Sequence, residues 1–162
     1  MKCAIYPGSF DPVTNGHINL VHRGLRMFDK LVVAVANNGH KSPLFSIDER
    51  VELLRECLSG EKRVEITSFE GLLVDYASSR GISVVIRGLR AVSDFEYEFQ
   101  MANMNRKLSP EIETIFMMTG ESHFYISSGF VREVARLGGS VRELVPEPVL
   151  NKLTEKFSST QP

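Results

Sequence analysis

Short apolar runs alternate with segments of helical periodicity along the chain, and this alternation restricts the fold more than any other feature. The runs that predict strands are 2–6, 31–36, 64–69, 83–88 and 113–118. Helical patterns lie at 17–28, 47–58, 72–81, 94–108, 127–139 and 147–157. Runs that are apolar throughout, such as LVVAVA (31–36), are typical of strands buried on both faces. The alternation therefore predicts an α/β fold: a Rossmann-like, doubly wound sheet of five parallel strands with helices on both faces.

Local signals refine the limits of these elements. Ser46 with Glu49, and Ser93 with Glu96, have the spacing of capping boxes, which predicts a helix start at each place. Gly81 has the position of a helix stop. The length of 162 residues suits one domain, so we expect a single domain over 1–162 with a frayed tail at about 158–162.

Charge and composition exclude several classes of protein. The formal net charge is -1, which provides no broad basic field for nucleic acid or an anionic membrane. Cys3 and Cys57 lie in an apolar run and a helical pattern, so we interpret them as buried thiols and not as a disulfide. The N-terminus has no signal-peptide pattern, and no apolar run is long enough to span a bilayer. We therefore expect a cytoplasmic protein.

The segment GSFDPVTNGH (8–17) follows the first predicted strand, at the sheet edge where open α/β folds bind ligands. Gly8 permits a sharp turn, and Thr14 or Asn15 can cap the next helix. His17 then lies in a first helical turn, where free N–H groups and the helix dipole favour an anion. This favours a phosphate-binding loop; the alternative is a turn with an incidental surface histidine.

Three later strand ends carry similar chemistry. Lys41 follows the second strand, although a single lysine is more often a solvated surface group. Arg87 and Arg90 follow the fourth strand and could grip two phosphate groups, or form surface ion pairs with Asp94 or Glu96.

Ser127 and Ser128 stand at a helix start, where they either bind phosphate or act as plain N-caps. No P-loop, no G-x-G-x-x-G and no order of residues for a covalent nucleophile is present. Asp11 and Glu98 could form a carboxylate pair, but nothing in the sequence brings them together. The residues together predict a polyphosphate site that acts by positioning and charge.

The same segments carry a family resemblance. YPGSFDPVTNGH (6–17) resembles the T/H-x-G-H signature of nucleotidyltransferases, and YISSGFVREV (125–134) resembles their I-S-S/T-S/T-x-x-R element. VIRGLRAVSDFEYEFQMANMNR (85–106) resembles the narrower family of bacterial phosphopantetheine adenylyltransferases, and the likeness runs from about residue 2 to about residue 150.

The resemblance implies Mg²⁺-dependent transfer of AMP from ATP to 4′-phosphopantetheine. The products are dephospho-coenzyme A and pyrophosphate, in the penultimate step of coenzyme A biosynthesis. It implies direct in-line attack on the α-phosphate by the 4′-hydroxyl, with Mg²⁺ held by ATP phosphates and not by protein side chains. It also implies a homohexamer, a dimer of trimers, and feedback inhibition by coenzyme A.

The family pattern implies roles for individual residues. His17 and Lys41 would be catalytic. The residues implied in ATP binding are Ser9, Phe10, His17, Gly88, Leu89, Arg90, Glu98, His123, Phe124, Tyr125, Ile126, Ser127, Ser128 and Gly129. Those implied in binding the acceptor are Ser9, Lys41, Leu73 and Arg87.

Three positions depart from the family pattern. Ser9 stands where many members have Thr, which retains the hydroxyl. Gly129 replaces a third Ser or Thr and removes one possible phosphate donor, so we expect a modest effect on ATP affinity. His123 replaces a frequent Trp, which puts adenine stacking there in doubt.

Other interpretations remain open at this point. An adenylyltransferase for nicotinate or nicotinamide mononucleotide, or a glycerol-phosphate cytidylyltransferase, would share the His17 loop but would not be expected to carry RGLRAVSDFEYE. A catalytically silent nucleotide-binding regulator is a different class of answer. The helix at 94–108 is also more apolar than core packing requires, which hints at an interface; its apolar residues are Phe95, Phe99, Met101, Met104 and Leu108.

Overall fold

The computed structural model describes residues 1–37, 42–120 and 126–158. Its strands are β1 (Cys3–Gly8), β2 (Lys30–Ala36), β3 (Val64–Phe69), β4 (Val84–Leu89) and β5 (Glu113–Met118). Its helices are α1 (Asn15–Gly24), α2 (Ile47–Cys57), α3 (Leu73–Ser79), α4 (Val92–Leu108), α5 (Ser128–Arg136) and α6 (Glu147–Ser158). Strands and helices alternate in the predicted order from β1 to α5, which confirms the α/β prediction.

The sheet has five strands in the order β3-β2-β1-β4-β5, and every pair is parallel. The chain moves outward from β1 through β2 to β3, then crosses to β4 and moves outward again to β5. This reversal confirms the doubly wound topology. It also leaves a switch point between β1 and β4, and ligands of open α/β sheets bind outside the carboxyl ends of the strands at such a point.

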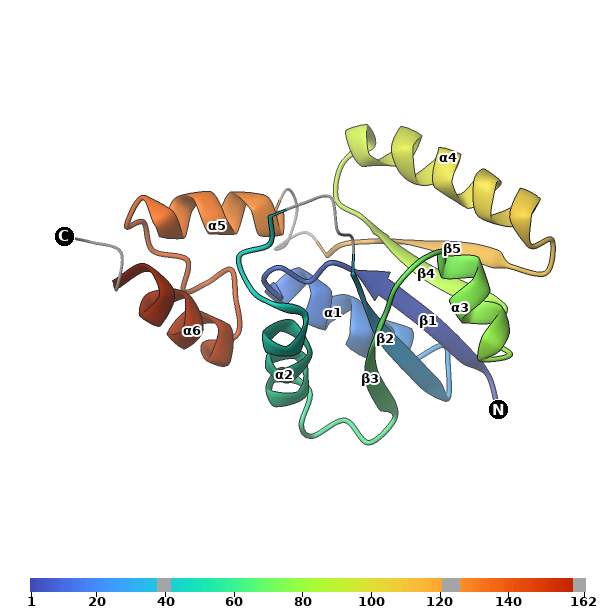
Figure 1. Ribbon diagram of the computed structural model, residues 1–162, viewed down its shortest axis with the longest axis horizontal. Helices are drawn as coiled ribbons and strands as arrows, with labels where there is room; N and C mark the ends of the chain where they lie inside the picture. The colour runs from blue at the N-terminus through green and yellow to red at the C-terminus, as the bar shows by residue number, and fades with distance from the viewer. Residues whose placement is uncertain (38–41, 121–125, 159–162) are drawn as a thin grey trace.

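Helices cover both faces of the sheet, as their two hydrophobic clusters show. Ala4 and Tyr6 of β1 belong to the larger cluster, which α1, α2, α5 and α6 complete. Ile5, which points to the other face, belongs to a second cluster with α3. This alternation follows from the two-residue period of a strand. Figure 1 shows α5 and α6 together at one end of the molecule, with α4 lying along the sheet at the side of β4 and β5.

Two predicted helix starts have different outcomes. Ser46 and Glu49 form the predicted capping box at the start of α2. The predicted box at Ser93 and Glu96 is wrong, because α4 already begins at Val92 and its N-cap, Ala91, makes no side-chain bond to the helix.

The carboxylate of Asp94 supplies the physical reason for this difference. It reaches back to accept a hydrogen bond from the backbone N–H of Arg90 at 3.2 Å. A side chain in the first turn therefore stabilises the helix entry, and the helix starts earlier than the Ser-Glu spacing predicts.

Cys3 and Cys57 are free thiols, as predicted, but they are only half-buried. In the described parts of the chain, no helix combines the length and the apolar character needed to cross a membrane.

Candidate functional site

His17 occupies the first turn of α1, directly outside the carboxyl end of β1. Thr14 is the N-cap, and its backbone N–H donates a hydrogen bond to Nδ1 of His17 at 3.0 Å. A backbone N–H can only donate, so Nδ1 must be the unprotonated nitrogen of the ring. The neutral imidazole therefore carries its proton on Nε2, where it can donate to a ligand.

The surroundings of His17 keep it neutral. Burial lowers the pKa of His17 to about 4, and the positive charges of Arg90 and Arg87 act in the same direction. The edge-on ring of Phe10 packs against the imidazole with a centroid separation of 5.0 Å. At physiological pH His17 is thus a neutral imidazole that can donate a hydrogen bond, and not an imidazolium.

The loop between β1 and α1 owes its shape to Phe10. This residue has a φ of 48°, in the left-handed region that non-glycine residues rarely adopt. Its ring is 1% exposed, and a Cβ at Gly8 would lie only 3.0 Å from it. The Phe10 side chain therefore belongs to the core and supports His17.

Ser9 is exposed beside Phe10 and is held by a residue that the sequence did not single out. Arg50 of α2 is only 4% exposed, and its Nη1 donates to the carbonyl oxygen of Ser9 at 2.8 Å. Its Nε donates to the carbonyl of Ser46. Arginines are rarely buried unless they are paired, so the burial of Arg50 marks it as a residue that holds other groups. Both its burial and its partners appear only in the tertiary structure.

Arg87 lies on the opposite side of the switch point, on β4. Its guanidinium makes a two-pronged ion pair with Glu98 of α4, at 2.7 Å and 2.5 Å, and donates to the carbonyl of Pro7 at 2.8 Å. Burial alone would lower the pKa of Arg87, but the bonds and charge of Glu98 raise it. Arg87 therefore joins β1, β4 and α4, and its ion-pair partner is Glu98 instead of the Asp94 or Glu96 considered from the sequence.

Arg90 does pair with Asp94, as one of the two sequence interpretations held, at 3.2 Å and partly in solvent. Between the two arginines, Gly88 packs so close to α1 that an added Cβ would lie 2.5 Å from Leu20. The carbonyl of Leu89 accepts from the backbone N–H of Thr119 at 2.9 Å. The backbone of 87–90 is thus held by packing against α1 and by the hydrogen bond to Thr119.

The N-terminus of α5 lies beside the loop that carries His17. Ser127 is its N-cap, and its Oγ accepts from the N–H of Phe130 at 3.0 Å. Ser128 Oγ donates to the carbonyl of Pro12 at 2.7 Å, in the His17 loop. The plain capping role of Ser127 is therefore present, and the helix N-terminus also lies next to the loop that carries His17, where it favours an anion.

Asp11 and Arg132 form a second contact between the His17 loop and α5. Asp11 is 4% exposed and accepts hydrogen bonds from the backbone N–H groups of Leu44 and Phe45, both at 2.9 Å, and from Arg132 of α5 at 3.1 Å. Because Asp11 binds Arg132 and Glu98 binds Arg87, the two carboxylates serve separate arginines. Arg132 was missed among the site residues, although the R of the I-S-S/T-S/T-x-x-R element was the signal for it.

Other predicted residues lie farther out or outside the described residues. Leu73 begins α3, after β3, and packs half-buried on the second hydrophobic cluster. Ile126 is half-buried against the first. Lys41 and the stretch 123–125 (His123, Phe124, Tyr125) lie outside the described residues. Among the described residues, no group of three or more His, Cys, Asp or Glu is placed to hold a metal ion.

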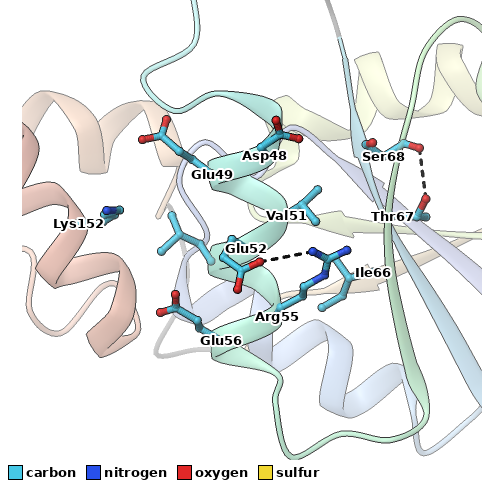
Figure 2. Close-up of a pocket in the computed structure, with 11 residues that line it drawn as sticks. Asp48, Glu49, Val51, Glu52, Arg55, Glu56, Ile66, Thr67, Ser68 and Lys152 are labelled. Carbon is cyan, nitrogen blue, oxygen red and sulfur yellow. Dashed lines mark hydrogen bonds and ion pairs between the residues drawn. The ribbon is translucent and has the colours of Figure 1, made fainter.

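A hollow of about 700 Å³ lies elsewhere, between α2 and the edge strand β3 (Figure 2). Four carboxylates from α2 line it, against two basic side chains; the acidic residues are Asp48, Glu49, Glu52 and Glu56. This lining would repel a polyphosphate. The switch point, where the donors are His17, Arg87, Arg90 and the α5 N-terminus, is the site that suits phosphate.

Comparisons with known proteins agree with this geometry. The family model of cytidylyltransferase-like proteins matches residues 5–134. A phosphopantetheine adenylyltransferase of Anaeromyxobacter sp. (strain K) is 62% identical over 96% of this chain and 95% of its own length. Proteins of the same name are 54% identical in Syntrophus aciditrophicus (strain SB), over 96% of this chain and 94% of their own, and 55% identical in Caldanaerobacter subterraneus subsp. tengcongensis, over 99% and 100%.

The matched region includes the described elements that surround the switch point, from the loop after β1 to the first turns of α5. Identity at this level over nearly the whole length of both chains leaves the same elements in the same order. The chain belongs to the phosphopantetheine adenylyltransferase family, within the larger group of cytidylyltransferase-like proteins.

Proposed function

We propose that the protein acts as a pantetheine-phosphate adenylyltransferase, which transfers AMP from ATP to 4′-phosphopantetheine and yields dephospho-coenzyme A and pyrophosphate. This is the activity named for its close, full-length relatives. The observation that carries it here is the neutral His17, with Nε2–H as its donor, near two arginines and a helix N-terminus at the switch point. Neutral and cationic donors suit direct transfer of a phosphoryl-type group.

The balance of atoms corrects one expectation about the attacking group. In 4′-phosphopantetheine the 4′-oxygen already carries a phosphate, so it is not a free hydroxyl. The attacking atom is therefore an oxygen of the acceptor's phosphate. It forms a bond to the α-phosphorus of ATP, the bond from that phosphorus to the oxygen bridging the β-phosphate breaks, and pyrophosphate leaves with the electron pair.

His17 would act on the transition state of this step. Its Nε2–H would donate to an oxygen of the α-phosphate, where negative charge increases as the attacking oxygen approaches. The bond from Thr14 fixes the ring orientation in advance, so little reorganisation is needed. No proton has to be transferred, which agrees with a histidine whose pKa is about 4.

The arginines would bind the charged groups on either side. Arg90 is more than one-third exposed and its ion pair with Asp94 is long, so it can turn to phosphates of ATP. Arg87 would bind the acceptor's phosphate at the outer side of its guanidinium, while Glu98 and the carbonyl of Pro7 hold it in place.

The remaining roles rest on the family pattern. Ser9, Lys41 and Leu73 would contact the acceptor, with Lys41 also near the transferring group. Backbone and side chains over 88–89 and 123–129, with Ser9 and Phe10, would enclose ATP. Mg²⁺ would be held through ATP phosphates and would neutralise their charge; the carboxylates of Asp11, Asp94 and Glu98 already pair with arginines.

A homohexamer, built as a dimer of trimers, is the assembly that we propose. Its support in this chain is an exposed apolar stripe on α4, whose four residues are each at least 42% exposed: Tyr97, Met101, Met104 and Leu108. Their spacing of four, three and four residues places them on one face of the helix.

Coenzyme A carries the same pantetheine arm and an adenine nucleotide, so we expect it to compete with the substrates at the site around His17. We place the reaction in the cytoplasm.

The test of this function is exchange of labelled pyrophosphate into ATP, with and without dephospho-coenzyme A. The reverse reaction requires dephospho-coenzyme A, so exchange should appear only when it is added and should disappear in His17→Ala. Exchange that does not depend on dephospho-coenzyme A would point to a covalent nucleotidyl-enzyme or another acceptor. No exchange despite ATP binding would favour a silent regulator.

A further inference from the structure

The buried carboxylate of Asp11 joins three segments that are far apart in the sequence. It lies in the loop before His17, and its two oxygens accept the backbone N–H groups of Leu44 and Phe45, just before α2. The same carboxylate binds Nη1 of Arg132 on α5, and Nη1 also donates to the carbonyl of Asp11 itself. Asp11 is thus hydrogen-bonded to Leu44, 33 residues later in the chain, and to Arg132, 121 residues later.

These bonds connect the two phosphate-binding elements of the proposed site. His17 lies at the start of α1, and the α5 N-terminus carries Ser127 and Ser128. Arg132 to Asp11 and Ser128 to Pro12 are two parallel links between them, both made by α5 side chains to the His17 loop. The distance between the group on the α-phosphate and the groups on the outer phosphates is therefore set by these links.

We propose that Asp11, through Arg132, is a positioning residue that aligns the His17 loop with α5 for the transfer step. The inference rests on the proposed function. ATP can still bind when the two elements shift relative to one another, since its triphosphate is flexible. In-line transfer needs both elements in register, because misplacement of reacting groups by about 1 Å can lower a rate by about 100-fold. Loss of the link should therefore lower kcat more than it raises the KM for ATP.

Kinetics of matched arginine variants test this alignment. Arg132→Met should lower kcat at least tenfold with a KM for ATP within threefold of the parent, and Arg132→Lys should restore kcat to within about threefold. Arg136→Met is the control, since Arg136 lies on the same helix and its ion pair with Glu133 is exposed; its kcat should stay within twofold. A rise in the KM for ATP without loss of kcat would show direct ATP binding by Arg132 and overturn the proposal, as would equal kcat values for Arg132→Lys and Arg132→Met.

Hydrogen exchange of the substrate-free protein tests, without activity, whether Asp11 holds the segment before α2. The amides of Leu44 and Phe45 should exchange at least tenfold faster in Asp11→Asn than in the parent, since an Asn side chain has one acceptor oxygen where the carboxylate has two. Unchanged exchange at both amides would show that Asp11 is not anchored there and would overturn its positioning role. An inactive parent protein with slow exchange at these amides would instead contradict the proposed function and leave the anchoring of Asp11 standing.

Discussion

At the scale of single residues, the site depends on one imidazole whose protonation is fixed by its backbone. The N–H of Thr14 occupies Nδ1 of His17, and burial with two nearby arginines removes the charge. The choice of tautomer is thus made by the helix cap before any ligand arrives. The motif spacing predicts a histidine in a first helical turn, but not which ring nitrogen is the donor.

Removal of the imidazole should destabilise the transition state of the transfer step and leave the binding of ATP in the ground state nearly unchanged. We expect His17→Ala to lower kcat by two to three orders of magnitude or more, equivalent to about 3 kcal/mol or more. ATP affinity should be nearly unchanged, because the arginines and α5 remain. Steady-state kinetics and equilibrium ATP binding check this, and a loss of turnover below tenfold would show that His17 is not the transition-state donor.

The low pKa of His17 gives a prediction for pH. The folded pKa of about 4 lies below the ordinary value of 6.5, so the unfolded chain binds this proton first as pH falls. This group therefore contributes a loss of stability as pH falls from 6.5 to 4, and no change above 6.5. NMR titration of the His17 ring, assigned with His17→Gln, should show no midpoint between pH 6 and 7; a midpoint there would contradict a neutral donor.

At the scale of elements, the ion pair of Arg87 with Glu98 fastens β4 to α4. We expect Arg87→Ala to destabilise the fold by about 3 kcal/mol, since it leaves a nearly buried carboxylate without its partner. Adding Glu98→Gln should recover part of this loss. Urea unfolding of the single and double variants measures it, and equal stability of the two would show that the pair contributes little.

The same variants separate the substrates. Arg87→Ala should raise the KM for phosphopantetheine much more than the KM for ATP, because Arg87 is assigned to the acceptor. Urea unfolding of Arg87→Ala shows whether the variant is folded at the assay temperature and is the control for loss of stability. Equal rises for both substrates would contradict this assignment.

The N-terminus of α5 offers a substitution that should improve the site. A Cβ at Gly129 would meet its nearest neighbours, Arg132 and Ser127, at an ordinary 3.8 Å. Gly129→Ser should therefore fit, raise stability by about 0.5 kcal/mol, and lower the KM for ATP a few-fold by adding a hydroxyl donor. Gly129→Ala is the control, which should gain the stability without the change in KM; a serine variant with the KM of the alanine variant would contradict the hydroxyl's role.

The elements also show what sequence patterns can and cannot predict. Periodicity predicts the strands and helices because each has one buried face or stripe, and the cap at Ser46 follows a local rule. The box at Ser93 is wrong because Asp94 bonds back to Arg90, a competition between nearby side chains that spacing alone does not settle. The roles of Arg50 and Asp11 could not be predicted, since their partners lie more than 30 residues away.

At the scale of the whole molecule, the proposed homohexamer can be tested at the exposed apolar stripe on α4. Met104→Glu places a charge in the middle of this stripe and should break the assembly into smaller species. Asn103→Asp, which adds one negative charge at an exposed position of the same helix, is the control for added charge. Analytical ultracentrifugation should show a lower mass for Met104→Glu alone; unchanged mass would place the subunit contact elsewhere.

The central claim is that the site at the switch point transfers AMP from ATP to 4′-phosphopantetheine. The most direct test is pyrophosphate release from Mg·ATP with 4′-phosphopantetheine, nicotinate mononucleotide and glycerol phosphate offered separately. We predict release with 4′-phosphopantetheine alone. Release with either of the other acceptors, or with none of the three, would contradict the claim.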